Sequence, residues 1–238
     1  MRAVLAVDAS MSKHLQHDLD RLKKEILAMG ALVEEAINRA IASLANRDAA
    51  LARQVLEGDD AIDRKEVEVE DMCLKMLALH QPVAGDLRYI IAVLKVNNDL
   101  ERMGDLAQNI AERALYLATH EPIEVDLDFS RMVELVRRMV GQSLDALVNQ
   151  DPVLARRVCM QDDEVDRLQR NMFEVLQALM TKDPRTVERA VQMLSVSRHL
   201  ERIADSTTNV AEDIVFMVEG DIIRHRADPA RNPPRVRR

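Results

Sequence analysis

Residues 100–112 read LERMGDLAQNIAE, and residues 200–212 repeat this pattern as LERIADSTTNVAE. Seven of the thirteen positions are identical. The shared polar residues follow steps of four, four and three, which place them within roughly 80° of arc on a helix. Each copy therefore predicts a helix with three carboxylates and one amide along one face: Glu101, Asp105, Asn109 and Glu112 in the first copy, and Glu201, Asp205, Asn209 and Glu212 in the second.

A row of acidic side chains on a helix is usually a solvated face. The repetition argues against that interpretation, because the order acid, acid, amide, acid is kept while residues 106–108, LAQ, become STT at 206–208. Drift on a solvated surface would not be expected to keep this spacing. We infer a chemical role for the stripe in both halves of the chain.

The composition favours helices and two similar domains. Aromatic residues make up 2% of the 238 residues, and Gly and Pro are few, whereas a sheet protein needs more aromatic and β-branched residues and more turns. The internal repeat favours two units over one large one. The predicted fold class is all-α, a tandem repeat of two three-helix bundles.

Charge and cysteine content limit the class of protein. The net charge of −8, without a dense basic cluster before the C-terminal tail, argues against nucleic-acid binding. Cys73 and Cys159 are far apart and have no C-x-x-C partner, as expected of buried thiols in a reducing compartment. The apolar run near the N-terminus is too short for a signal peptide, and no run approaches a membrane span. We expect a soluble, cytoplasmic protein.

Periodicity and turn residues predict three helices in each half. Ser12 is expected to cap a helix to about residue 46, Asp48 to start one through residue 78, and Asp86 to open a third after the break at 80–82. In the second half the predicted helices cover about 129–149, 151–180 and the stretch from the turn at 182–184 to Gly220. The predicted domains are 12–119 and 129–222, joined by a linker at 120–128, with flexible tails at 1–11 and 226–238.

A second acidic motif is repeated as well. Residues 51–64, LARQVLEGDDAIDR, match residues 154–167, LARRVCMQDDEVDR. Each copy has two aspartates four residues apart, Asp59 with Asp63 and Asp162 with Asp166. Acids at a helix start are explained by the helix dipole, but the predicted boundaries put these pairs about three turns inside their helices.

Hairpin geometry predicts that the two kinds of acidic pair meet. The midpoint of Asp59 and Asp63 is 21 residues before Pro82, and the midpoint of Glu101 and Asp105 is 21 residues after it. In an antiparallel hairpin such residues lie level. The second half behaves alike, with 20 and 19 residues on either side of Pro184.

Carboxylates gathered between two helices repel one another unless cations compensate them or water screens them. Oxygen ligands suit magnesium, calcium, manganese or iron, whereas zinc usually prefers His and Cys but can be held by carboxylates. The di-iron pattern of ferritin-like bundles also needs Glu-x-x-His pairs, which are missing here. We therefore expect divalent or trivalent metal ions without redox catalysis.

Several stretches together resemble the phosphate-uptake regulator family, PhoU. They are LDRLKKEILAMGALVEEAI, VLEGDDAID, HQPVAGDLR, LERMGDLAQNIAE and HLERIADSTTNVAEDIVFMVEGDIIRH, and the resemblance spans about residues 14–226. It implies two three-helix bundles with pseudo-twofold symmetry and metal clusters at the acidic motifs. Carried over by position, the motif falls on Asp59, Asp63, Glu101, Asp105, Asp162, Asp166, Glu201 and Asp205, and Asn109, Glu112, Asn209 and Glu212 extend it.

The resemblance also implies a function and partners. It implies a negative regulator of the phosphate-starvation response that links the ATPase subunit of a phosphate ABC transporter to a sensor histidine kinase. A homodimer is expected, with contact to the membrane only through partner proteins. The Arg-rich end after His225 and the first ten residues have no counterpart in the resemblance.

Two other functions remain open from the residues themselves. One is a metal-dependent phosphate-ester hydrolase, in which the carboxylate clusters activate water, and the other is a metal buffer or structural bundle. The sequence contains no catalytic triad motif and no glycine-rich phosphate loop, so we expect no enzyme. His80 and His199 are interpreted as hydrogen-bonded or solvent-facing helix residues.

Overall fold

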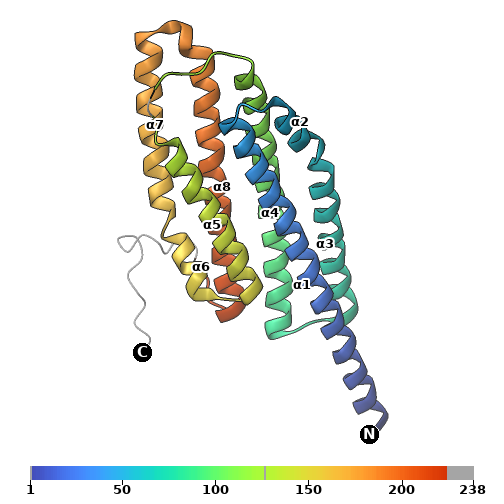
Figure 1. The fold of residues 1–238 in the computed structure, drawn as a ribbon. Coiled ribbons are helices and arrows are strands. Elements are labelled where there is room, and N and C mark those ends of the chain that lie inside the picture. The colour runs from blue at the N-terminus through green and yellow to red at the C-terminus, as the bar shows by residue number, and fades with distance from the viewer. Residues whose placement is uncertain (1, 126, 224–238) are drawn as a thin grey trace, which may run out of the picture.

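The structure is a computed structural model that describes the backbone of residues 2–125 and 127–223. Side chains are described in these ranges from residue 13 onward, except at residue 59. All regular elements within the described residues are helical (Figure 1). In chain order they are α1 (Arg2–Ala45), α2 (Ala49–Glu57), α3 (Asp59–His80), α4 (Ala84–Ala118), α5 (Phe129–Asn149), α6 (Pro152–Cys159), α7 (Asp162–Lys182), the 3-10 helix η1 (Pro184–Thr186) and α8 (Val187–Glu219).

The helices form two units of the same design that lie side by side (Figure 1). In the first, α1, the bent rod α2–α3, and α4 form a three-helix bundle, and α5, the bent rod α6–α7, and α8 repeat it. The predicted all-α tandem repeat is therefore confirmed. The described residues of the connection, 119–125 and 127–128, contain no helix.

Both hairpin turns lie where the sequence predicts them. The first follows His80, with Gln81 in the left-handed region at φ 47° and Pro82 after it. His80 Nε2 lies 2.9 Å from Oδ2 of Asp18, which ties this turn to α1. Gly220, at φ 75°, ends α8 as expected, because glycine adopts this conformation without a steric penalty.

The predicted start of the first helix is wrong, and two predicted helices are each interrupted. The first helix begins at Arg2, so Ser12 lies inside it and does not cap it. The predicted helices 48–78 and 151–180 are each broken, after Glu57 and after Cys159. Asp59 and Asp162 are therefore the first residues of α3 and α7 and do not lie three turns inside a helix.

The two breaks occur at matching positions but have different local causes. Gly58, a weak helix former, separates α2 from α3. In the second half Gln161 stands before α7, and its side chain is held by Arg138 and Gln142 of α5 at 3.1 and 2.7 Å. The short helices are started alike, because the carboxylates of Asp48 and Asp151 each accept hydrogen bonds from two backbone amides.

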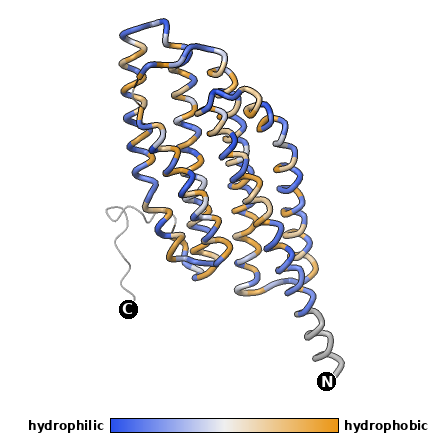
Figure 2. Tube along the Cα trace, in the orientation of Figure 1, coloured by the Kyte–Doolittle hydropathy of each residue, from blue (hydrophilic) through white to orange (hydrophobic). Residues whose placement is uncertain are grey.

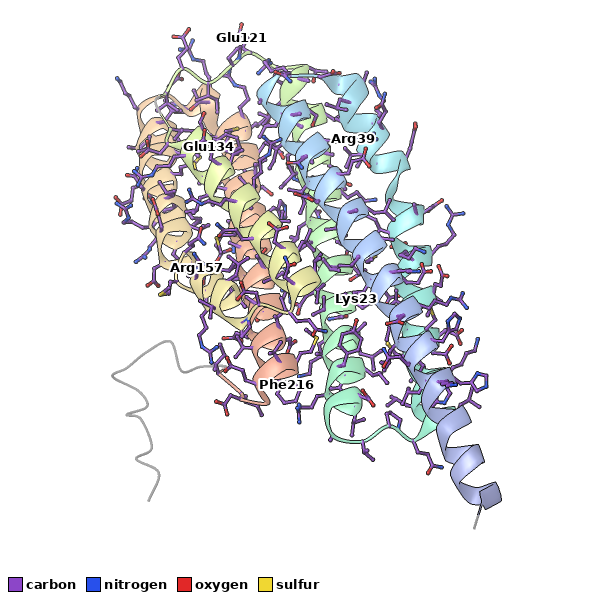
Figure 3. All side chains as sticks on the ribbon, turned by 60° about the horizontal axis from the view of Figure 1, so that its bottom comes forward. Lys23, Arg39, Glu121, Glu134, Arg157 and Phe216 are labelled. Atoms are coloured by element: carbon purple, nitrogen blue, oxygen red, sulfur yellow. The ribbon has the colours of Figure 1, made fainter. Side chains whose placement is uncertain are left out.

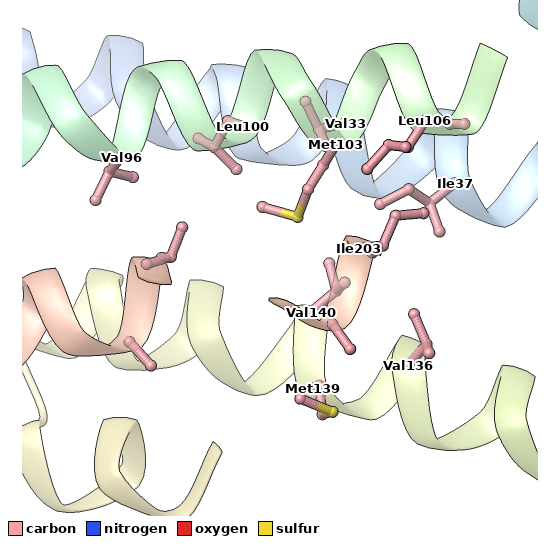
Figure 4. Close-up of a cluster of buried hydrophobic side chains, with 14 of the residues drawn as sticks. Val33, Ile37, Val96, Leu100, Met103, Leu106, Val136, Met139, Val140 and Ile203 are labelled. Carbon is pink, nitrogen blue, oxygen red and sulfur yellow. The ribbon is translucent and has the colours of Figure 1, made fainter. Parts of the chain in front are cut away.

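The core is continuous across both units. α4 and α8 run antiparallel and share the most extensive contact in the molecule. Fully buried side chains from both helices meet there, and side chains of α1 and α5 cover them on one side (Figure 4). Apolar and polar residues alternate along each helix, as an inward apolar face requires (Figure 2).

A substitution at this contact tests whether the two units unfold together. Leu100 is fully buried between the units. Leu100→Ala should lower the free energy of unfolding by about 2–5 kcal/mol and keep a single transition, because both units share the core. Urea unfolding followed by circular dichroism measures this. The control is Leu79→Ala at a site 72% exposed. Two separate transitions in the parent chain would contradict the shared core.

Candidate functional site: two acidic clusters

The second half brings four predicted carboxylates together. Asp162 and Asp166 lie at the start of α7, and Glu201 and Asp205 lie on the facing part of α8. Burial, followed by repulsion from Asp205 and Asp166, raises the pKa of Asp162 to about 6. Its Oδ1 atom is buried and has no hydrogen-bond partner. This carboxyl group is therefore held where its charge is poorly compensated.

The two α8 members of this cluster have the same character. Burial raises the pKa of Glu201 first, and Asp205 and Asp166 raise it further. Burial and Asp166 also raise the pKa of Asp205, whereas Arg102 and Arg202 oppose the increase. The hairpin register predicted from Pro184 is therefore the register of the structure.

The first half has a more open version of this arrangement. Burial raises the pKa of Asp105 on α4, and the carboxylate of Asp63 on α3 adds to it. The side chain of Asp59, the fourth predicted member with Glu101, lies outside the described residues. Glu66 extends the cluster along α3, because burial and the carboxylates of Glu70 and Asp63 raise its pKa.

The amides and last acids of the stripes have separate surroundings. Asn109 Nδ2 donates to the backbone oxygen of Asp105 at 2.8 Å, whereas Asn209 Nδ2 donates to Asp99 of α4 at 3.4 Å. Glu112 pairs with Arg113 at 2.8 Å. Burial, followed by the carboxylate of Glu212, raises the pKa of the Cys159 thiol to about 11. These four positions thus extend the stripes, and their printed partners differ between the two halves.

The helical spacing places Glu66 on the acidic stripe of the first half, and it offers Arg102 only as a partner for the acids of its own helix. Glu66 follows Asp63 by three residues on the same face of α3, so the helical spacing contained a signal for it. Arg102 belongs to the first half and acts on Asp205 of the second half. That proximity follows from the packing of α4 on α8, and the repeat by itself contains no signal for it.

The donor set fits a hard cation. Carboxylate oxygens are the ligands that magnesium, calcium and manganese prefer, and the buried, unpaired oxygen of Asp162 is a suitable donor. Among the described side chains, however, no three His, Cys, Asp or Glu groups are close enough to hold one metal ion. Coordination by three of the described side chains would therefore require side-chain rearrangement.

Comparison with known proteins identifies the family. A family model described as the PhoU domain matches residues 26–114 and again residues 129–214. The chain belongs to the PhoU family. The two matched segments fall on the two bundles, so the sequence repeat, the structural repeat and the family domain coincide.

Individual relatives agree along most of the chain. A phosphate-specific transport system accessory protein PhoU homolog of Aquifex aeolicus (strain VF5) is 43% identical over 209 residues, which cover 88% of this chain and 95% of the relative. The homolog of the same name from Pseudomonas aeruginosa is 37% identical over 216 residues, 90% of this chain and 89% of that protein.

Solved structures share the fold. The crystal structure of PhoU from Pseudomonas aeruginosa has a TM-score of 0.84 and 36% identity, and the match covers 87% of this chain and 99% of that one. The phosphate transport system regulatory protein PhoU from Streptococcus pneumoniae has a TM-score of 0.78 and 27% identity, covering 87% and 98%. No helix in the described ranges is long and apolar enough to cross a membrane.

The pKa of Asp162 leads to a stability prediction. The pKa of Asp162 is about 6 in the folded protein, whereas an ordinary aspartate has a pKa of 3.8. The ionised side chain therefore destabilises the fold increasingly as the pH rises between these values, and fully above pH 6. Asp162→Asn should therefore raise the free energy of unfolding at pH 7.5 by about 1–2 kcal/mol, after allowance for solvent screening. The gain should shrink as the pH falls from 6 to 4 and be absent below that.

Urea unfolding across this pH range, in metal-free buffer with a chelator, measures the effect. Asp145→Asn on the exposed surface of α5 is the matched control. A gain that is the same at pH 4 and pH 7.5 would show that charge repulsion at Asp162 is not the cause.

Proposed function

We propose that this protein is a negative regulator of the phosphate-starvation response that acts as a cytoplasmic adaptor. In this proposal it contacts the ATPase subunit of a phosphate ABC transporter and a sensor histidine kinase. The observation that carries the proposal is the match of both bundles to the PhoU domain, together with relatives named as accessory proteins of phosphate-specific transport.

The repeat architecture supports action by contact. Two bundles of the same design supply two similar sets of surfaces on one rigid molecule, because α4 and α8 share a buried core. Binding of one partner can then change the affinity for the other by a coupling free energy of typically ~1–3 kcal/mol. This mode of action requires no bond to be made or broken, so the proposed function is not enzymatic. The proposed oligomer is a homodimer.

Metal binding at the acidic clusters is part of the proposal. Asp162, Asp166, Glu201 and Asp205 would hold a cation in the second half, and Asp63, Asp105, Glu101 and Asp59 in the first. A bound divalent or trivalent ion, whether iron, zinc, magnesium, calcium or manganese, would compensate the repulsion that raises the pKa of these groups. The mutual repulsion within each cluster supports this assignment.

Isosteric substitutions test the metal sites. Glu201→Gln with Asp205→Asn should weaken metal binding at the second cluster, and Glu101→Gln with Asp105→Asn should weaken it at the first. Both should lower the metal content of the protein, because amides bind hard cations more weakly than carboxylates. Elemental analysis after dialysis against each metal gives the readout. Glu134→Gln with Asp145→Asn on α5 removes the same charge elsewhere. Metal content unchanged in both cluster variants would refute the sites.

Gene deletion tests the regulatory role. If the protein represses phosphate-starvation genes, deletion should leave these genes expressed in phosphate-rich medium, as measured by transcript levels. Complementation with the intact gene is the control. Normal repression without the protein, in a strain with no second copy, would rule out the role, and failure to co-purify with the transporter ATPase would rule out the contact mechanism.

A further inference from the structure

The contact between α4 and α8 contains an ion pair whose carboxylate is buried and whose lysine side chain is 40% exposed. Lys95 Nζ of α4 lies 3.3 Å from Oδ1 of Asp213 on α8, and the side chain of Asp213 is only 2% exposed. One turn further along, Asn209 donates to Asp99, which is also buried. The ammonium group of Lys95 stands 5.2 Å from the ring centre of Phe216, near the end of α8 (Figure 3).

The pseudo-twofold relation gives each of these residues a counterpart 100 positions away, because residues 100–112 align with 200–212. The counterpart of Lys95 is Ser195, and that of Asp213 is Arg113. Asp99 corresponds to His199, whose Nε2 lies 3.1 Å from Ser195 Oγ. The backbone repeats at the two ends of the contact, but the charges do not.

This asymmetry affects what happens when two chains meet. If α4 of one chain packed on α4 of another in the same register, Arg113 would take the place of Asp213. Lys95 would then face Arg113 at both ends of the contact. Two like-charge pairs in a partly buried contact oppose this association.

The alternative contact between two α8 helices is also disfavoured. Ser195 would then take the place of Lys95, and the buried carboxylate of Asp213 would face a hydroxyl group in place of an ammonium group at both ends. Loss of the ion pair with Lys95 disfavours this arrangement. Of the three pairings, only α4 with α8 places Lys95 opposite Asp213.

We infer that the Lys95–Asp213 pair determines which halves of this protein associate. It selects the contact of α4 with α8 and prevents like halves of two chains from joining through the same apolar surface. The partner that this surface excludes is thus a second copy of the chain. Two similar apolar faces in one sequence create the need for such discrimination.

Exchange of the two charges tests the inference, because it keeps the composition and the ion pair. In Lys95→Asp with Asp213→Lys, α4 still pairs with α8 through opposite charges. Residue 95 would now attract Arg113 of a second α4, at both ends. The exchanged chain should therefore form α4–α4 contacts that the parent does not form.

Disulfide trapping reads out this contact in full-length chains. Met103 contacts Thr207 of α8, with Sδ and Oγ1 3.6 Å apart, and Ala107 is the counterpart of Thr207. A chain with Met103→Cys is refolded together with a tagged chain with Ala107→Cys under mild oxidation, and the mixed disulfide is measured on a non-reducing gel. In each experiment the two chains share the same residues at positions 95 and 213, either the parent pair or the exchanged pair. One chain with Met103→Cys and Thr207→Cys shows that native contacts can be trapped.

The native thiols of Cys73 and Cys159 should contribute only a low background of disulfide, because burial raises their pKa values to about 12 and about 11. Exchange of the charges should increase the mixed disulfide by about tenfold or more, equivalent to about 1.4 kcal/mol. If circular dichroism shows that the exchanged chain is unfolded, Lys95→Met with Asp213→Leu decides, because it removes the repulsion without introducing attraction. The inference is overturned if the folded charge variant gives the same yield of mixed disulfide as chains that keep Lys95 and Asp213.

Discussion

The antiparallel packing of α4 on α8 is the interaction on which the rest of the structure depends. Met103 of α4 contacts Thr207 of α8 there, and both side chains are fully buried. Each helix presents one side to this contact and another to its own bundle. The positions of the two bundles relative to each other, and of both acidic stripes, therefore follow from one contact.

The acidic clusters depend on this core because they oppose folding themselves. Carboxylates that raise one another's pKa destabilise the arrangement that brings them together. Apolar burial along α4 and α8 offsets this cost. Natural proteins keep such unfavourable groups mainly where they have a function, which agrees with the preservation of the stripe in both halves.

Much of the fold follows from the sequence, because helical periodicity and the two proline turns are local signals. The meeting of Asp63 with Asp105 also follows, since counting from Pro82 fixes the register of the hairpin. The breaks within the second and fifth helices do not follow as readily. Gly58 marks one of them, but the other depends on contacts of Gln161 with α5, which the local sequence does not contain.

The least predictable features involve residues from opposite halves. Asn109 and Asn209 occupy the same place in the repeat, yet the first donates to its own helix and the second to Asp99. The difference arises because His199 stands where a second aspartate would be required. Repeated residues have equivalent partners only where those partners are repeated as well.

The breaks before the acidic pairs have a consequence for the independence of local structure. α2 and α6 contain only nine and eight residues, and helices of this length are marginal in water on their own. Their helical conformation depends on burying Ala52 and Val55, or Ala155 and Val158, against the long helices. The segments that lead into both acidic clusters are thus ordered by tertiary contacts, so each cluster can be complete only after its own bundle has assembled.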